Sequence, residues 1–345
     1  MKTIRTALTA LALLALLAGP ALCQEIWQEQ RITDDHTWFT GATLLWEDKI
    51  YWTDRRNGYG EIYTWDQTGG ERRLIGGDGI SRGSAAIWGD QMVVSRYVSG
   101  QRHLYLWDPV NGERAITPTP TNQLNPAISN GVVAWEDYRS GIPQIYVWDA
   151  VNGERRVSPT NSDQTNPRVS ENGTVVWEDR RNGRSDVYMW NLADGEKRLS
   201  TYISDMSAPA IYQDRVTMWL IGGSFPEDRG LWEWTSDHGL RQLGQISYTD
   251  PYSIMYARMW GDLVVWQSGN GPSGVMAWDP MHGFIRVNQT AFGYARSPSV
   301  FENKVAWVGN YDIYLSTLVP EPSGLAALSL SACLLWPIMR RRTRH

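Results

Sequence analysis

The sequence predicts an all-β protein, a seven-bladed β-propeller built from four-stranded antiparallel blades, and three observations lead to this fold class. A short apolar run recurs seven times along the chain. Each copy lies in a segment of about 42 residues that carries four strand signals separated by turn residues, as a propeller blade does. The last copy is one strand short, and a matching strand is present near the N-terminus.

The recurring run is the third strand signal of each segment. Its copies are Glu61–Asp66, His103–Asp108, Gln144–Asp149, Asp186–Asn191, Gly230–Thr235, Gly274–Asp279 and Asp312–Thr317. One position of the run is tryptophan six times and Ser316 in the last copy, with spacings of 42, 41, 42, 44, 44 and 38 residues. A fixed period of this length is typical of blade repeats.

The third segment shows the four strand signals most clearly. They are Pro126–Ser129, Val132–Glu136, Ile145–Asp149 and Arg155–Ser158. The breaks between them are Asn130-Gly131, Arg139–Gly141 and Asn152-Gly153, which are residues that form tight hairpin turns. No helical period is present in the body, so each segment is expected to form one antiparallel sheet.

The two ends of the repeat array complement each other. The seventh segment stops after its third strand, at Leu318, and Gln30–Thr33 matches the fourth-strand signal Arg155–Ser158. The N-terminal strand is therefore expected to complete the last blade, which removes an open sheet edge.

The turn motifs resemble those of the TolB-like propeller family, in which a strand ending in an acidic-Arg-Asn-Gly turn leads into an Asp-Ile-Tyr strand. Trp177–Gly183 followed by Asp186–Tyr188 is a close match, and Trp52–Gly58 and Trp135–Gly141 are similar. The Trp-Asp pairs also resemble WD repeats, but the Gly-His pair of those repeats is absent. The resemblance implies a TolB-like propeller over most of the body.

Residues 1–23 have the order of a secretory signal peptide. Lys2 and Arg5 precede the apolar run Ala7–Ala18, and Ala21–Cys23 offers a small-x-small cleavage site before Gln24. Signal peptidase is the expected partner here. Leu22 disfavours the alternative of lipidation at Cys23, because a small residue is wanted there.

Residues 319–345 carry a second signal. The motif Val319-Pro320-Glu321-Pro322 is followed by the apolar stretch Gly324–Met339 and then by Arg340, Arg341 and Arg342. The stretch is slightly shorter than the ~20 residues of a membrane-spanning helix, and the arginines would keep that end cytoplasmic. This pattern resembles the PEP-CTERM sorting signal, which implies recognition by an exosortase-type enzyme and a transmembrane helix. A plain C-terminal anchor is the alternative. Either reading places the body, residues 24–318, at the cell envelope, the cell surface or outside the cell.

Composition excludes several classes of site in the body. Both cysteines lie in the terminal segments, so a disulfide, a Cys-ligated metal and a Cys nucleophile are excluded. The formal charge of −5 becomes −5 − 6 = −11 without Lys2, Arg5 and the four C-terminal arginines. Such an acidic body is not expected to bind nucleic acid. The histidines are scattered, and neither a catalytic residue, a metal site nor a cofactor is predicted.

Most tryptophans recur in register and are expected to pack blade on blade. Three acidic–arginine turns recur as well, with the pairs Asp54–Arg55, Asp137–Arg139 and Asp179–Arg180, which are expected to be solvated ion pairs. The density of arginine on that face also suggests binding of an anionic glycan through arginine forks.

Departures from the repeat give the candidate binding site. Blade five has a longer loop after Trp219, and the following interblade loop, after Leu243, is longer again. Together with another interblade loop they are expected to gather aromatic and acidic side chains on one face, a composition that suits sugar or peptide binding. The candidate ligand-binding residues are Trp38, Phe225, Glu227, Asp228, Tyr248, Tyr252 and Tyr256.

These features favour an exported surface module that binds an envelope or extracellular polysaccharide, or a protein partner, over an enzyme. Two alternatives stay open: an exported polysaccharide lyase or glycoside hydrolase, and a structural coat protein without a discrete ligand. Fold class does not decide between them.

Overall fold

The computed structural model describes residues 26–34, 42–117, 121–158, 161–200, 205–220, 228–245, 254–269, 274–288 and 295–319. The predicted signal peptide and the residues from Pro320 onward lie outside the described residues. Val319 is the last residue of a strand. Within the described ranges no helix has the length and apolar character needed to cross a membrane.

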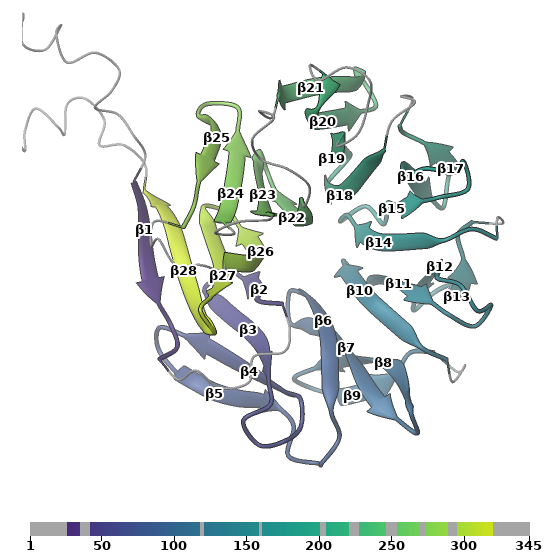
Figure 1. Ribbon diagram of the computed structural model, residues 1–345. Helices are drawn as coiled ribbons and strands as arrows, with labels where there is room; N and C mark the ends of the chain where they lie inside the picture. The colour runs from purple at the N-terminus through teal and green to yellow at the C-terminus, as the bar shows by residue number, and fades with distance from the viewer. Residues whose placement is uncertain are drawn as a thin grey trace, which may run out of the picture. The chain divides into compact units, whose positions relative to one another are not determined.

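Seven four-stranded sheets form the fold, and the sheet order confirms the predicted all-β propeller with four-stranded antiparallel blades (Figure 1). The innermost strands of blades one to seven are β2 Leu44–Trp46, β6 Arg82–Trp88, β10 Gln123–Ser129, β14 Gln164–Val169, β18 Met206–Tyr212, β22 Met255–Trp260 and β26 Ala295–Phe301. The second strands are β3 Lys49–Asp54, β7 Gln91–Val98, β11 Val132–Asp137, β15 Val175–Asp179, β19 Arg215–Leu220, β23 Leu263–Ser268 and β27 Lys304–Gly309.

The two outer strands of each blade follow the same pattern. The third strands are β4 Glu61–Asp66, β8 Gln101–Asp108, β12 Gln144–Asp149, β16 Asp186–Asn191, β20 Gly230–Thr235, β24 Gly274–Asp279 and β28 Asp312–Val319. The fourth strands are β5 Gly70–Ile75, β9 Gly112–Ala115, β13 Gly153–Arg156, β17 Gly195–Arg198, β21 Gly239–Gln245, β25 Gly283–Arg286 and, in blade seven, β1 Ile26–Arg31.

The chain divides into two compact units. Residues 29–316 form one, which holds the propeller core, and the two chain ends, residues 1–28 and 317–345, form the other. Of the second unit the structure describes the short strand segments at residues 26–28 and 317–319.

Turn chemistry sets the strand boundaries. Asn130 and Gly131 have φ values of 45° and 78°, which a tight hairpin between β10 and β11 requires. The aspartate of each Trp-Asp pair ends the third strand by accepting backbone N–H groups of the next turn. Asp149 Oδ1, for example, accepts from Val151 N at 2.9 Å and Asn152 N at 2.7 Å. This local capping explains why the Trp-Asp motif recurs at the same place in four of the blades.

The N-terminal strand closes blade seven, as predicted, where β1 lies beside β28 (Figure 1). Ile32 N donates to Ile313 O at 2.8 Å, and Ile313 N donates to Thr33 Oγ1 at 2.9 Å. Arg31 Nη2 also lies 2.7 Å from Asp312 Oδ2. The strand itself covers Ile26–Arg31, earlier than the predicted Gln30–Thr33, while Ile32 and Thr33 form the last bonds of the closure.

Second-strand tryptophans form the core between blades, as expected from their register. They are almost completely buried: Trp52, Trp135, Trp177, Trp219, Trp266 and Trp307. Trp177 stacks on Tyr188 with ring centroids 6.0 Å apart, and the guanidinium of Arg181 lies over the same tyrosine ring, 4.0 Å from its centroid. Blades one and three repeat this Trp–Tyr–Arg stack.

The aspartates of the acidic–arginine turns are buried rather than solvated, which corrects the sequence prediction, while their arginine partners are partly exposed. Asp179 is fully buried, and its carboxylate accepts hydrogen bonds from Arg181 N at 2.9 Å and Arg181 Nη2 at 2.6 Å. Asp54 pairs with Arg56, not Arg55, and Asp179 with Arg181, not Arg180. The arginine two residues after the aspartate is the one whose side chain folds back over the tyrosine ring. These arginines are consequently engaged inside the blade and do not form free forks for a glycan.

A second polar link joins three of the blades to the next. The residue after the second-strand tryptophan accepts a hydrogen bond from a backbone N–H thirty residues further along. The pairs are Glu136 with Asn166 N, Glu178 with Ala208 N and Gln267 with Ser297 N. Each donor residue has a positive φ, at a β-bulge that bends the innermost strand toward the centre. The bulge also explains why β10 begins at Gln123, before the predicted Pro126.

Candidate ligand site in the central channel

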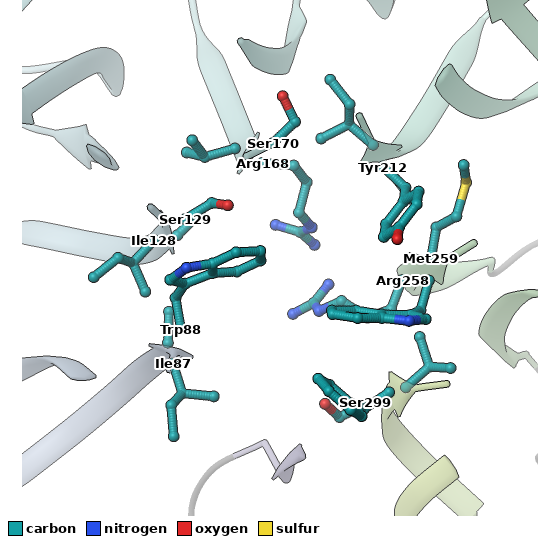
Figure 2. A pocket seen from close by; sticks show the side chains of 18 of the residues that line it. Ile87, Trp88, Ile128, Ser129, Arg168, Ser170, Tyr212, Arg258, Met259 and Ser299 are labelled. Carbon is teal, nitrogen blue, oxygen red and sulfur yellow. The ribbon is translucent and has the colours of Figure 1, made fainter. Parts of the chain in front are cut away.

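A cavity of about 160 Å³ lies at the centre of the seven blades, where the innermost strands face one another (Figure 2). Every innermost strand contributes to its wall, from β2 in blade one to β26 in blade seven. The channel has two ends. We call the end at the turns between first and second strands, such as Asn130-Gly131, the hairpin end, and the end where each innermost strand begins the loop end.

Two arginines break the regularity of this wall. Strand pairing aligns one position of the seven innermost strands, which is Leu44, Ala86, Ala127, Arg168, Ala210, Arg258 and Ser299. Five blades therefore have a small or apolar residue where blades four and six have arginine. Figure 2 shows the Arg168 and Arg258 guanidinium groups pointing into the centre of the channel from different sides.

Both arginines are held by the same local contact. Arg168 Nη1 donates to the carbonyl of Pro167 at 2.7 Å, and Arg258 Nη1 donates to the carbonyl of Ala257 at 2.9 Å. The Nε of Arg168 is buried and has no hydrogen-bond partner among the described residues. Because a guanidinium carries further N–H donors, each group keeps donors for a molecule in the channel.

No carboxylate in the described part of the chain pairs with these two arginines. Glu136 and Glu178 lie close enough to Arg168 to influence it electrostatically, but their Oε1 atoms accept backbone N–H groups of the neighbouring blade. Arg82 in β6 shows the usual arrangement for a buried arginine: Asp78 and Glu113 lie 2.8 Å and 2.6 Å from it. The channel pair therefore consists of two cations without a counter-ion from the described protein.

Burial makes the charged form of both groups unfavourable. Desolvation lowers the pKa of Arg168 to about 10, although Glu178 and Glu136 offset part of the effect. Desolvation also places the pKa of Arg258 well below its usual range, and the positive charge of Arg168 adds to this. Because a guanidinium keeps its proton in proteins, the unfavourable energy is relieved most readily by a bound anion.

A layer of aromatic rings crosses the channel on the hairpin side of the arginines. It is formed by Trp46, Trp88, Tyr212, Trp260 and Phe301, one from each of five blades. The ring centroids of Trp46 and Trp88 are 4.6 Å apart, and Trp260 lies 5.7 Å from Trp46 and 6.4 Å from Trp88. Phe301 lies 4.2 Å and Tyr212 5.3 Å from Trp260.

The other two blades have serine at this level. Ser129 and Ser170 are themselves buried, at 1% and 3% exposure. Contact between Trp88 of blade two and Trp260 of blade six spans the channel, so we call this set of five rings the aromatic layer. It places apolar ring faces in the cavity wall next to two positive charges, and the wall continues past the rings to Glu171 and Gln213 at the hairpin turns.

The predicted insertion site falls largely outside the described residues. Trp38, Phe225, Glu227, Tyr248 and Tyr252 are not described, so their expected gathering stays a prediction. The backbone carbonyl of Asp228 accepts a hydrogen bond from Trp232 Nε1 at 2.9 Å. Tyr256, two residues before Arg258, is 46% exposed and lies close enough to both channel arginines to affect them electrostatically. It is the predicted site residue that the structure connects with the channel.

Sequence reasoning missed the channel residues. The repeat pattern groups the first-strand aromatics with the other tryptophans as blade-packing residues and does not single out the two arginines. Aligning the innermost strands by their repeat would have exposed Arg168 and Arg258, because most blades carry a small residue there. Within the described ranges no group of three or more histidine, cysteine, aspartate or glutamate side chains is arranged to hold a metal ion.

Comparison with known proteins identifies the fold. No family model matches the chain, and no curated protein matches it. Among solved structures, an oligogalacturonate lyase in complex with manganese is similar, with 13% identity and a TM-score of 0.64 over 86% of this chain and 94% of that one. A streptogramin B lyase has 10% identity and a TM-score of 0.60 over 85% and 98%. TolB from Acinetobacter baumannii has 17% identity and a TM-score of 0.49 over 73% of this chain and 66% of that one. At these identities the likeness concerns the fold.

Proposed function

We propose that this protein is an exported, surface-associated binding module that takes an acidic saccharide into its central channel. One observation carries the proposal: two partly buried arginines, without carboxylate partners among the described residues, converge on one cavity beside a layer of aromatic rings. A guanidinium presents parallel N–H donors that match the two oxygens of a carboxylate. Uronic acids combine such a carboxylate with a ring that can lie against an aromatic face.

Export belongs to the same proposal. The signal-peptide pattern of residues 1–23 and the PEP-CTERM-like residues 319–345 support passage to the cell envelope, with signal peptidase and an exosortase-type enzyme as partners. An envelope or extracellular polysaccharide is the acidic saccharide that a protein in that place would meet.

The two buried aspartates of the blade turns are suited to holding the blades together rather than to acid catalysis. Asp137 and Asp179 are buried, and burial raises the pKa of each, but hydrogen bonds from Arg139 and Arg181 outweigh it, so both have lowered pKa values. General-acid catalysis requires a carboxyl whose pKa is raised toward neutrality. The name of one structural neighbour, an oligogalacturonate lyase, describes action on an acidic sugar, so a test of binding should also follow cleavage.

The test uses the full chain in mild detergent with a panel of soluble polyuronates and matched neutral polysaccharides. Binding is measured by calorimetry, and polymer length is measured in the same samples. We expect retention of polyuronates without shortening and no retention of neutral polymers. Arg168→Met and Arg258→Met should each weaken binding at least about tenfold, since a charge-assisted hydrogen bond contributes ~1.5–3 kcal/mol.

Arg72→Met is the matched control. It removes the same charge from an arginine on the outer strand β5, away from the channel, and should leave affinity unchanged. An equal loss in the control would show that overall charge, not the channel, determines binding. Shortening of the polymer would make the protein an enzyme and overturn the assignment of a binding module. Absence of polyuronate binding would overturn the proposed ligand.

A further inference from the structure

We infer that the site prefers an acidic saccharide with spaced carboxylates, in which each acidic residue is flanked by residues without negative charge, over a run of contiguous uronic acids. This inference rests on the proposed function and specifies the class of its ligand. Three observations carry it: the end at which the cavity opens, the side chains between that opening and the arginines, and the charge around the opening.

The cavity opens at the hairpin end. Its wall runs from the level of Arg168 and Arg258, past the aromatic rings, to Glu171 and Gln213 at the hairpin turns of blades four and five. Both turn residues are exposed, and within the described ranges no loop-end residue lines the wall. Asn130 Nδ2 of blade three donates to the carbonyl of Glu171 at 3.1 Å, which holds the two neighbouring turns together. A ligand therefore reaches the arginines from the hairpin end.

Small polar side chains border the way in on one side. Trp88 in blade two and Tyr212 in blade five carry rings, whereas Ser129 and Ser170 take the place of a ring in the two blades between them. Ser129 Oγ is buried and has no hydrogen-bond partner among the described residues, so it is available to a sugar hydroxyl. In the view of Figure 2 the Arg168 guanidinium is visible between the side chains of Trp88 and Tyr212.

Acidic side chains surround the opening. Five of the seven turns between first and second strands carry an exposed carboxylate without an ion-pair partner in the described part of the chain: Glu47, Asp90, Glu171, Asp214 and Glu302. Asp48 is paired with Lys304. Asp262 is likewise paired with Arg215, which leaves Lys49 as the remaining cation of these turns. The opening is thus negative on balance, whereas the space behind it is positive.

This order of charges selects for spaced carboxylates. Glu171 follows Arg168 by three positions, which is ~10 Å along an extended strand. A saccharide that places one carboxylate at the arginines therefore has a neighbouring residue at the level of the turns. A second carboxylate at that level is repelled by Glu171 and the other acidic turn residues. A neutral residue meets no such repulsion, and a residue with an ammonium group is attracted.

The spacing of the carboxylates is the quantity to vary. Oligosaccharides of equal length are compared by calorimetry with the full chain in mild detergent: contiguous uronic acids, uronic acids alternating with N-acetylated amino sugars, and the same alternating chains after removal of the acetyl groups. We expect affinity to rise in that order by about two- to fifteenfold at each step, the range that Coulomb's law gives for two charges ~10 Å apart between water and a protein surface. Added salt should narrow these differences, because it screens the charges at the opening.

Glu171→Gln tests the opening directly. It removes one carboxylate from the cavity wall, so affinity for contiguous uronic acids should rise and the preference for alternating chains should shrink. Asp163→Asn is the matched control, since it removes an exposed carboxylate at the loop end of the same blade. This control should leave the preference unchanged. An equal change in both variants would overturn the inference, because overall charge and not the opening would then set the preference.

The outcomes also separate this inference from the proposed function. If contiguous uronic acids bind at least as tightly as the alternating chains, while Arg168→Met still weakens binding, the inference is wrong and the proposed ligand class stands. If none of the three sets of oligosaccharides binds, the proposed function fails and the inference falls with it.

Discussion

Replacing a channel arginine by methionine should stabilise the protein, which is the opposite of what the same replacement does elsewhere in the propeller. Arg168 is a partly buried, desolvated cation without an ion-pair partner among the described residues. Its pKa of about 10 lies roughly 2.5 below that of an ordinary guanidinium, and about 1.4 kcal/mol per pH unit gives ~3 kcal/mol of unfavourable interaction for the charged form.

Methionine fills a similar volume without a charge. Buried ionic groups replaced by apolar ones of similar size commonly give stability gains of ~1–4 kcal/mol. Loss of the hydrogen bond from Arg168 to the carbonyl of Pro167 offsets part of this gain. We therefore expect Arg168→Met to raise the free energy of unfolding by about 1–3 kcal/mol. With an unfolding entropy of ~2.1 cal/mol/K per residue over roughly 290 residues, this raises the melting temperature by about 2–5 °C.

Arg181→Met is the matched comparison. Arg181 lies 2.6 Å from both Asp179 and Glu196, and Asp179 is fully buried. Removing the arginine leaves an unpaired buried carboxylate, which costs about 3–5 kcal/mol. The free energies of unfolding are obtained from urea titrations of both variants and the wild type, with and without ligand. A loss of more than about 1 kcal/mol in Arg168→Met would refute the reasoning, because it would show that the protein already neutralises this charge.

Three further outcomes are expected. Glu178→Ala should cost about 1–3 kcal/mol in urea titrations, because the backbone N–H of Ala208 loses its acceptor, and a neutral effect would mean that water replaces the link. Asp179 has a folded-state pKa below its unfolded value of ~3.9, so its stabilising effect is present above pH ~4 and is lost as pH falls through the folded-state value. Acid titration of Asp179→Asn should accordingly show a shallower loss of stability than the wild type, and identical slopes would exclude this carboxylate as a contributor. Deleting residues 24–33 should leave β28 as an open edge and produce oligomers in size-exclusion chromatography, whereas a stable monomer would show that blade seven stays closed without β1.

The architecture was predictable because the strand signals, the turn residues and the tryptophan spacing all recur with the same period. The hairpin dipeptide Asn130-Gly131 adopts a turn conformation that few other residue pairs adopt. The number of blades follows from the regular spacing of the third-strand tryptophans alone, without information on packing. The missing strand of blade seven could be matched to the N-terminus because each of the other six blades carries four strand signals.

The interior chemistry was less predictable, for physical reasons that differ between sites. The predicted partner of Asp179 is one residue too early in the sequence. The choice between Arg180 and Arg181 depends on which side chain reaches over Tyr188, and the residue spacing does not determine this. Arg168 and Arg258 were overlooked because a solvated surface residue and a channel residue look alike in a strand of seven residues or fewer. The insertion loops have no period at all, and most of their residues lie outside the described part of the chain.

The closure of blade seven has a consequence for how the protein is made. Thr33 bonds to Ile313 across 280 positions of the sequence. Synthesis proceeds from the N-terminus at ~5–20 residues per second, so the first strand waits roughly 15–60 s for its partner. During that interval six blades can assemble in order, but the strand that completes the ring has no neighbour to pair with. The earliest part of the propeller to appear is thus the last to become protected from hydrogen exchange and proteolysis, and truncated nascent chains never reach that point.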